Sequence, residues 1–551
     1  MKTLTRFACC ALLLIAHIAF ASDGSNFANR SASLQFGPPF RLYPSSTRQT
    51  ETFITRNPIN NNILFASANT IGPTGFISEG VYVSTDAGQT WTGNDTCTGG
   101  PVLGFHKGDP AIAIDRNGTF ILVRLGFSPG AFSHWSTTNG RTWTNQKTIS
   151  TDDQDRASVA SDPLAASAFF GRTYATWVRL APPYRIYYSY TDDGGLNWTV
   201  PASMNNPSQR GQGAEVSIGP NGRINICWAG VIPSSPYTED FVGFATSTDG
   251  GSTWTVTENA YDMNGIQGTF TQKGNIRVNG LPKIDTDRTG GQRNGWIYIV
   301  TTQKNLAPAG SDPDVIIHRS TDNGQTWLPG VRVNQDPLNN GKYQYFPAIH
   351  VDDGGGVNVL YYDDRTTNID SAGVAVSRSV DGGATWTDYR LVDRHFRPQP
   401  ISSSFGQGYQ GDNIGMTSVG NTLWPVWMDN SSGIYQIWTC PINLSSVSVD
   451  AIDQTIPALL KLNQNFPNPF NPATTIGFEV PSSGMPAGRH GFVSLKVFDV
   501  LGREVETLVH EDLKGGNYTR VFDGSRHPSG VYYYRLTTSA FSVTKSMVLM
   551  K

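Results

Sequence analysis

The octapeptide STDGGSTW, Ser247–Trp254, is the strongest indication of the fold, because close copies of it recur along the chain. Most copies have a Ser or Thr in first place, an Asp in third, a Gly in fifth and a closing Trp. The tryptophans follow one another at intervals of roughly fifty to seventy residues, the length of a small antiparallel sheet. The other five copies are STDAGQTW (84–91), STTNGRTW (136–143), TDDGGLNW (191–198), STDNGQTW (320–327) and SVDGGATW (379–386).

The segments between the copies alternate apolar and polar residues, as β-strands do. In each repeat an apolar strand such as Asp109–Asp115 is followed by a short turn and a second strand such as Thr119–Leu125. A third strand, such as Asp314–Ser320, leads into the octapeptide, and a fourth follows its Trp. Repeats of this kind predict an all-β fold in which each repeat is one blade of a β-propeller.

The number of first strands gives the expected number of blades. There are seven such strands and six octapeptides, so we expect seven blades, with six as the alternative. The last repeat lacks an octapeptide. Its outer strand is expected to come from Phe40–Pro44, because pairing of the two ends removes exposed sheet edges. The first strands are expected to begin near Glu51, Asp109, Arg156, Glu215, Leu281, Phe346 and Asp412.

The residue types of the octapeptide are those of a tight turn. Its Gly takes a positive φ, its Ser, Thr and Asp side chains accept backbone N–H groups, and its Trp packs the turn onto neighbouring strands. One copy has Thr138 in the Asp position, and we expect a looser turn there. The pattern S-x-D-x-G-x-T-W is the Asp-box, and the chain resembles the sialidase-like Asp-box (BNR-repeat) propellers. The structural Asp-box residues are Asp86, Asp193, Asp249, Asp322 and Asp381.

The C-terminal part of the sequence predicts a second domain. We assign residues 22–445 to the propeller, 446–459 to a linker and 460–551 to a small immunoglobulin-like β-sandwich. The motifs NFPNPFNPATTI, VFDVLGREV and SGVYYYRL make this region similar to the C-terminal sorting domain of type IX secretion cargo. That resemblance implies a Gram-negative host of the Bacteroidetes and their relatives, export through the periplasm to the surface or medium, and the type IX machinery as a partner. The alternative is a plain adhesive module.

The N-terminus and the composition narrow the class further. Residues 1–21 have a basic start, a short apolar run and the small-x-small sequence Ala19-Phe20-Ala21, which predicts a secretory signal peptide. Its removal takes Lys2 and Arg6 and changes the net charge from -3 to -5. Without a basic cluster or a long apolar run, we expect neither a nucleic-acid partner nor a membrane span. The three remaining cysteines have no CxxC spacing, which argues against a zinc site.

Strand order predicts which residues share a face of the propeller. The start of each first strand and the end of each second strand lie at one face, and the octapeptides lie at the other. The first group contains carboxylates that raise one another's pKa when they converge, and arginines that bind a carboxylate bidentately. The candidate catalytic residues are Asp109, Glu215, Asp412 and Tyr409. The candidate substrate-binding residues are Arg124, Arg179, Arg365, Glu51 and Asp155.

Two hypotheses follow. The resemblance to sialidases implies a glycoside hydrolase that acts on sialylated or related glycans or glycoproteins, with an arginine cluster, an acidic acid/base and a tyrosine nucleophile. The second hypothesis is a noncatalytic surface propeller that binds glycans or a protein. We expect no required cofactor, and a structural Ca²⁺ or water is the alternative role for the carboxylates. Sialidases carry an early F/Y-R-I-P motif, but Phe40–Pro44 has one residue more, and Arg41 matches Arg277 and Arg332 as an outer-strand position.

Overall fold

The structure, a computed structural model, describes residues 34–97, 106–126, 128–401, 406, 408–444, 461–480, 491–513, 516–538 and 542–551. The chain divides into two compact units, Met1–Ser446 and Val447–Lys551. The expected signal peptide and linker lie outside the described residues. In the described ranges, no helix is long and apolar enough to cross a membrane.

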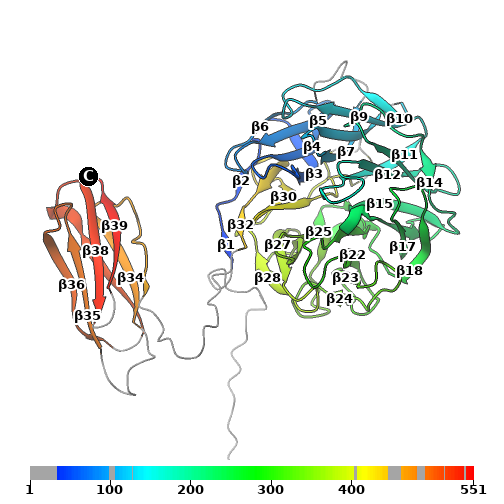
Figure 1. Cartoon of the computed structure of the whole chain (residues 1–551). Coiled ribbons are helices and arrows are strands. Elements are labelled where there is room, and N and C mark those ends of the chain that lie inside the picture. Colours follow the sequence, from blue (N-terminus) through cyan, green and yellow to red (C-terminus); the bar gives the residue numbers. More distant parts are fainter. Residues whose placement is uncertain are drawn as a thin grey trace, which may run out of the picture. The chain divides into compact units, whose positions relative to one another are not determined.

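The first unit is a ring of antiparallel sheets, whose strands run in chain order from the centre of the ring outward (Figure 1). This is the all-β propeller architecture that the repeats predicted. Six sheets consist of β3 (Arg48–Arg56), β4 (Leu64–Gly72), β5 (Gly75–Ser84) and β6 (Thr92–Asn94); β7 (His106–Ile114), β8 (Phe120–Gly126), β9 (Ala131–Ser136) and β10 (Lys147–Ser150); β11 (Gln154–Ser161), β12 (Thr173–Arg179), β13 (Ile186–Thr191) and β14 (Ala202–Ser203); β15 (Arg210–Ile218), β16 (Ile224–Val231), β17 (Glu239–Ser247) and β18 (Thr255–Asp262); β21 (Lys283–Thr286), β22 (Ile297–Gln303), β23 (Asp314–Ser320) and β24 (Val331–Arg332); β25 (Gln344–Val351), β26 (Val357–Asp363), β27 (Gly373–Ser379) and β28 (Thr387–Arg390).

A further sheet joins the two ends of this unit. It contains β29 (Gly415–Val419), β30 (Thr422–Asp429) and β31 (Gln436–Thr439), with β2 (Phe40–Arg41) as its outer strand. Phe40 lies opposite Thr439 and Arg41 opposite Trp438, which confirms the expected contribution of the N-terminal segment. We interpret these seven sheets as the blades. The short elements outside this pattern are β1 (Gln35–Phe36), β32 (Ile442–Asn443), β19 (Gly268–Phe270), β20 (Ile276–Val278) and the 3₁₀ turns η1 (Pro220–Gly222) and η2 (Thr271–Lys273).

The Asp-box tryptophans hold neighbouring blades together. Trp143 of the second blade packs on Phe65 of the first, with ring centroids 5.6 Å apart. Trp91 of the first blade packs edge-on against Trp424 of the last, at 6.5 Å, so the same contact also closes the ring. Each large aromatic surface is thus shared by two sheets. Equivalent contacts join Trp198 to Ser133, Trp254 to Tyr188 and Trp327 to Phe244.

Each Asp-box turn is held by hydrogen bonds to its own side chains. In the first copy the hydroxyl of Ser84 and the backbone N–H of Thr90 both donate to Asp86 Oδ1 at 2.8 Å. In the copy that lacks the aspartate, the backbone N–H of Thr142 donates to Thr138 Oγ1 at 3.0 Å, and the two hydroxyls lie 2.8 Å apart. The hydroxyl of Thr138 keeps the hydrogen-bond pattern of the carboxylate, but the matching bonds are longer, in agreement with the expected looser turn.

The strand registers place the Asp-boxes and the inner-strand starts at opposite faces, as expected. Ser84, which opens the first Asp-box, lies opposite Leu64 at the beginning of β4. Thr50, next to Glu51, lies opposite Asn69 near the end of β4. We call the face where the inner strands begin the mouth, and the other the Asp-box face.

The second unit is an antiparallel β-sandwich with its own core. One sheet has the order β33–β34–β37 and the other β36–β35–β38–β39. Alternate side chains such as Leu495, Phe522 and Tyr534 are buried between the sheets. The strands are β33 (Lys461–Leu462), β34 (Ala473–Val480), β35 (Gly491–Phe498), β36 (Glu504–Leu513), β37 (Gly516–Asp523), β38 (Gly530–Thr538) and β39 (Ser542–Leu549), with the 3₁₀ turn η4 (Gly524–Arg526).

Candidate functional site at the mouth

The inner strands share a local distortion at the mouth. In β3, β7, β11, β15 and β25 a β-bulge shifts the register with the second strand. A bulge re-aims the neighbouring side chains, and a left-handed φ in a non-glycine residue persists only where its surroundings hold it. The mouth is therefore where the regular sheets are bent. The left-handed residues of the five bulges are Glu51, Asp109, Arg156, Gly213 and Phe346.

Two mouth carboxyls, Asp109 and Asp155, are open to a ligand. Both are partly exposed. Within the described residues, neither carboxyl group takes part in a hydrogen bond or ion pair. The backbone N–H of Asp109 donates to Asn69 Oδ1 at 2.9 Å, which fixes the position of that residue.

The pKa of Asp109 is high. Burial, followed by the negative charges of Asp155 and Asp412, raises it to about 7. Burial also raises the pKa of Asp155, although the nearby Arg156 opposes that rise. Near neutral pH, Asp109 is therefore divided between its protonated and ionised forms.

Glu51 and Asp412 form an acidic pair next to Asp109. The backbone N–H of Asp412 donates to Glu51 Oε1 at 3.0 Å, and Asn413 Nδ2 donates to Glu51 Oε2 at 2.6 Å. Burial and the charges of Asp412 and Asp109 raise the pKa of Glu51 well above its ordinary value. Burial acts in the same direction on Asp412, but Arg156 and Arg277 outweigh it and lower that pKa. Within the pair, the surroundings therefore favour the proton on Glu51 and the negative charge on Asp412.

Two cations hold Glu215 and Asn413 in the same network. Arg156 Nη2 donates to Asn413 Oδ1, and Arg156 Nε lies 3.8 Å from Glu215 Oε1. Lys283 Nζ pairs with Glu215 Oε1 and donates to Asn413 Oδ1 at 2.8 Å. The hydroxyl of Ser158 donates to Glu215 Oε2 at 2.9 Å. Glu215 thus lies in the site as expected, but its oxygens are already occupied.

Arg277 is a mouth residue that the sequence placed wrongly. Arg41 and Arg332 lie in the outer strands β2 and β24 as expected, whereas Arg277 lies in β20, part of an inserted two-stranded hairpin. Its side chain is exposed, and its guanidinium carbon is 5.7 Å from the ring centroid of Tyr409. In the described part of the chain this guanidinium has no hydrogen bond or ion pair, so it is available to an anion.

Tyr409 lies in the site as a neutral hydrogen-bonding group. Its side chain is buried, and its hydroxyl accepts a hydrogen bond from Asn69 Nδ2 at 3.0 Å and lies 3.2 Å from Thr50 Oγ1. Burial and the charges of Glu51 and Asp109 raise its pKa well above the ordinary value. A nucleophilic tyrosine needs easier ionisation, so these surroundings favour a positioning role.

Two of the three expected arginines are not at the mouth surface, and the third is engaged. Arg124 is completely buried, donates from Nη2 to Gln146 Oε1 at 2.6 Å and cannot reach a ligand. Arg179 lies at the mouth end of β12, but its guanidinium pairs with Asp152 at 3.1 Å. Arg365 is buried against Asp388, 2.6 Å away. Sequence position at a strand end therefore did not distinguish a surface arginine from a buried one.

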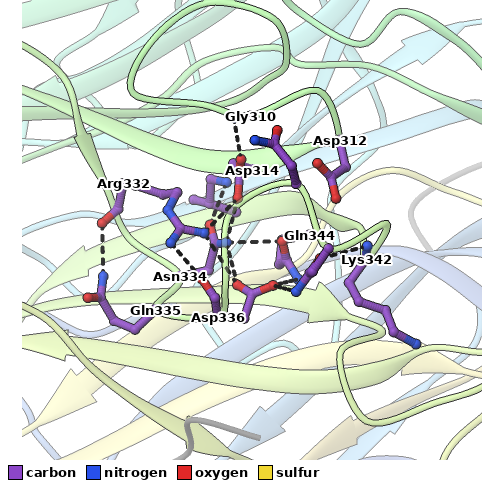
Figure 2. Close-up of polar contacts among 12 residues, drawn as sticks. Gly310, Asp312, Asp314, Arg332, Asn334, Gln335, Asp336, Lys342 and Gln344 are labelled. Carbon is purple, nitrogen blue, oxygen red and sulfur yellow. Dashed lines mark hydrogen bonds and ion pairs between the residues drawn. The ribbon is translucent and has the colours of Figure 1, made fainter. Parts of the chain in front are cut away.

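Arg365 adjoins a buried polar network between the blades that contain β24 and β25, part of which is drawn in Figure 2. At its centre Asn334 Nδ2 lies 2.7 Å from Asp314 Oδ1, 2.7 Å from Asp336 Oδ1 and 3.0 Å from Gln344 Oε1. Asp314 belongs to the blade that contains β24 and Gln344 to the blade that contains β25, so the contacts of Asn334 join the two blades. Among the described residues, no group of three or more His, Cys, Asp or Glu side chains is arranged to hold a metal ion. A structural Ca²⁺ stays a prediction.

A central cavity of about 500 Å³ runs between the inner strands. All seven inner strands contribute to its wall. Glu215 and Lys283 line it and also belong to the mouth network, while Asp285, His350 and Asp353 are among its other polar lining residues. The network at the mouth is therefore continuous with the channel.

The sequence indicated the acids of the site but not most of its cations and amides. Arg156 and Asn413 each follow an acid that was selected, so adjacency was an available signal. Arg277 lies in an inserted hairpin, and Lys283 follows it; the repeat pattern does not predict the course of this hairpin. Asn69 comes from the end of a second strand, where only charged residues had been considered.

Two segments of the chain match known families. Residues 47–227 match the BNR repeat-like domain, and residues 464–550 match the secretion system C-terminal sorting domain. The chain thus carries a BNR-repeat propeller and a sorting domain, and the latter indicates export.

Several solved structures are similar in fold. A protein of unknown function from Dyadobacter fermentans is 13% identical, with 75% of this chain and 99% of that chain covered and a TM-score of 0.43. An ulvan lyase of a polysaccharide lyase family is 12% identical, with 74% and 94% covered and a TM-score of 0.44. The leech intramolecular trans-sialidase is 12% identical, with 68% and 71% covered and a TM-score of 0.38. No curated protein matches the sequence.

Proposed function

We propose that this chain is an exported glycoside hydrolase whose general acid is Asp109. The observation that carries the proposal is the partly exposed Asp109 carboxyl, which has no hydrogen bond or ion pair among the described residues and lies near Asp155 and Asp412. Burial and these two acids raise its pKa to about 7. A protonated acid next to a carboxylate is the pairing that glycoside hydrolysis needs. The resemblance to sialidase-like Asp-box propellers supports a glycan as the substrate.

The proposed reaction assigns one proton transfer to each acid. As the bond between the anomeric carbon and the leaving oxygen breaks, Asp109 gives its proton to that oxygen. Water supplies the hydroxyl group that joins the anomeric carbon, and its remaining proton goes to the Asp412 carboxylate. Transfer of that proton to solvent and reprotonation of Asp109 restore the starting state.

The exposed Arg277 favours an anionic sugar at this point. Its guanidinium has no ion-pair partner among the described residues, and arginine binds a carboxylate through two parallel hydrogen bonds. Sialic acid and uronic acids both carry such a group. The sorting domain supports export by the type IX machinery to the cell surface or the medium.

A second candidate is a noncatalytic propeller that binds a glycan or a protein at the mouth. It is favoured by the burial of Glu51, Arg156 and Asn413, whose polar groups largely satisfy one another. Such a network also suits a rigid platform. This candidate predicts saturable binding without product.

The test is release of sugar by the full-length exported chain from a panel of fluorogenic sialosides, uronides and neutral glycosides. We expect release from an anionic member, with kcat/KM falling as the pH rises through about 7, because Asp109 must be protonated. Failure to release any sugar, with and without Ca²⁺, would contradict the hydrolase and favour the binding platform.

A further inference from the structure

Arg210 at the mouth lies close to two tyrosine rings. It is the first residue of β15, and its guanidinium carbon lies 4.8 Å from the ring centroid of Tyr184 and 5.1 Å from that of Tyr237. Tyr184 comes from the loop between β12 and β13, and Tyr237 from the loop between β16 and β17. Both loops lie at the mouth, because they connect second strands to third strands.

The two tyrosines are presented by the same kind of turn. Each follows a proline and has a left-handed backbone, with φ of 60° at Tyr184 and 63° at Tyr237. In each turn the tyrosine N–H donates to the carbonyl three residues earlier, Ala181 or Ser234, at 2.8 Å. A left-handed φ is unusual for a bulky residue. The chain therefore builds this costly turn twice, in neighbouring blades, with a tyrosine facing Arg210 each time.

The edge of the Arg210 guanidinium is left without an anion. Its Nε is buried and has no hydrogen-bond partner, and no ion pair of Arg210 occurs in the part of the chain that the structure describes. Arg210 is close enough to Asp155 to act on it electrostatically. Tyr237 is 41% exposed, so one ring of the stack is open to solvent.

A second stacked arginine shows how this chain completes such a group when it is structural. Arg172 lies between Phe169 and Tyr190, with its guanidinium carbon 4.9 and 4.0 Å from their ring centroids. There the edge is filled, because Arg172 Nε pairs with Asp192 at 2.7 Å and Nη1 donates to Gly250 O at 3.0 Å. Arg210 has the same aromatic support without the acid.

We propose that Tyr184, Arg210 and Tyr237 form a subsite for an oxyanion-bearing sugar next to the mouth acids. The two rings pack against the guanidinium, and its N–H groups that have no protein partner are available to a carboxylate or a sulfate ester. The exposed ring of Tyr237 offers an apolar surface for the sugar ring. This inference rests on the proposed function for its place beside the reacting bond, but binding at the subsite does not require turnover.

The test is calorimetric binding by the full-length Asp109→Asn protein, which holds the substrate without cleaving it. The probes are a β-1,4-glucuronate hexasaccharide, cellohexaose and sulfated cellohexaose, which share one backbone. We expect an anionic probe to bind, and Arg210→Met to weaken it about tenfold or more. Whether the glucuronate or the sulfated probe binds shows whether the subsite takes a carboxylate or a sulfate ester.

Arg172→Met is the matched control, because it removes a stacked arginine from the Asp-box face and leaves the subsite intact. We expect it to keep the affinity. Tyr237→Ala, a change at an exposed ring, should weaken binding even if Arg210→Met folds poorly. Equal binding of the neutral probe, unchanged affinity in both subsite variants, or no binding of any probe would overturn the proposal. A lack of turnover in the wild type, with binding preserved, would overturn only the proposed hydrolase.

Discussion

Asp249 in an Asp-box and Asp109 at the mouth are the same residue type in opposite surroundings. Hydrogen bonds from the Thr253 side chain and backbone and from Ser247 lower the pKa of Asp249 to about 2. Burial and two neighbouring acids raise the pKa of Asp109 to about 7. The Asp-box carboxylate is supplied with donors by its own turn and is structural. The mouth carboxyl is given none, and it stays available for proton transfer.

The largest expected effect separates the two aspartates by turnover. Asp109→Asn should lower kcat/KM about 10²- to 10⁴-fold, because the amide cannot donate the proton. Asp249→Asn, at the other face, should leave kcat/KM unchanged. The measurement is steady-state release of the fluorophore from the best glycoside. Equal activity in both variants would show that the Asp109 carboxyl is no more important for turnover than an Asp-box carboxylate.

The second effect concerns the contacts between blades. Trp143→Ala removes a ring that is buried against Phe65 of the preceding blade. Loss of a buried aromatic side chain costs about 3–5 kcal/mol of unfolding free energy. Denaturant unfolding measures the loss. A loss below about 1 kcal/mol would show that the Asp-box tryptophans do not hold the blades together.

The third effect is a pH dependence of stability that originates at the mouth. The pKa of Asp109 rises from 3.8 to about 7 on folding. The free energy that Asp109 contributes to the stability of the fold is therefore fully present below about pH 4 and is lost as the pH rises to about 7. Asp109→Asn removes this pH-dependent loss of stability, so the variant should gain up to about 4 kcal/mol of unfolding free energy over the wild type between pH 4 and 8. Unfolding free energies at both pH values test this. A constant difference would contradict the raised pKa.

The smallest effect has the opposite sign and comes from an Asp-box. The pKa of Asp381 is lowered to about 2 against burial, by hydrogen bonds from Thr385 and Ser379. The free energy that Asp381 contributes to the stability of the fold is present above about pH 4 and is lost as the pH falls toward 2. Asp381 is exposed, so Asp381→Asn should cost less than about 1 kcal/mol at pH 7. The same cost at pH 2.5 as at pH 7 would contradict this assignment.

The fold was largely predictable because its determinants are local and repeated. An Asp-box is complete within eight residues, since Ser84, Asp86 and Thr90 satisfy one another. The closing strand was also predictable, because Phe40–Pro44 has the pattern of a strand and the last repeat lacks one.

The site was predictable only in part because it depends on contacts between distant blades. Repeat position correctly brought Asp109, Asp155 and Asp412 to one place. It could not show that Arg124 would be buried, which depends on the packing of its blade. It also could not place Arg277, because an inserted hairpin interrupts the repeat. The left-handed bulges that direct the mouth side chains leave no mark in the hydrophobic pattern.

An infrared titration of the wild type against Asp109→Asn shows whether Asp109 carries a proton near neutral pH. The difference spectrum isolates the C=O stretch of the protonated Asp109 carboxyl. We predict that this band is present at pH 5 and disappears with a midpoint of about 7. A band already lost by pH 5 would show that Asp109 is an ordinary ionised surface carboxylate, and it would contradict its proposed role as the acid of the site.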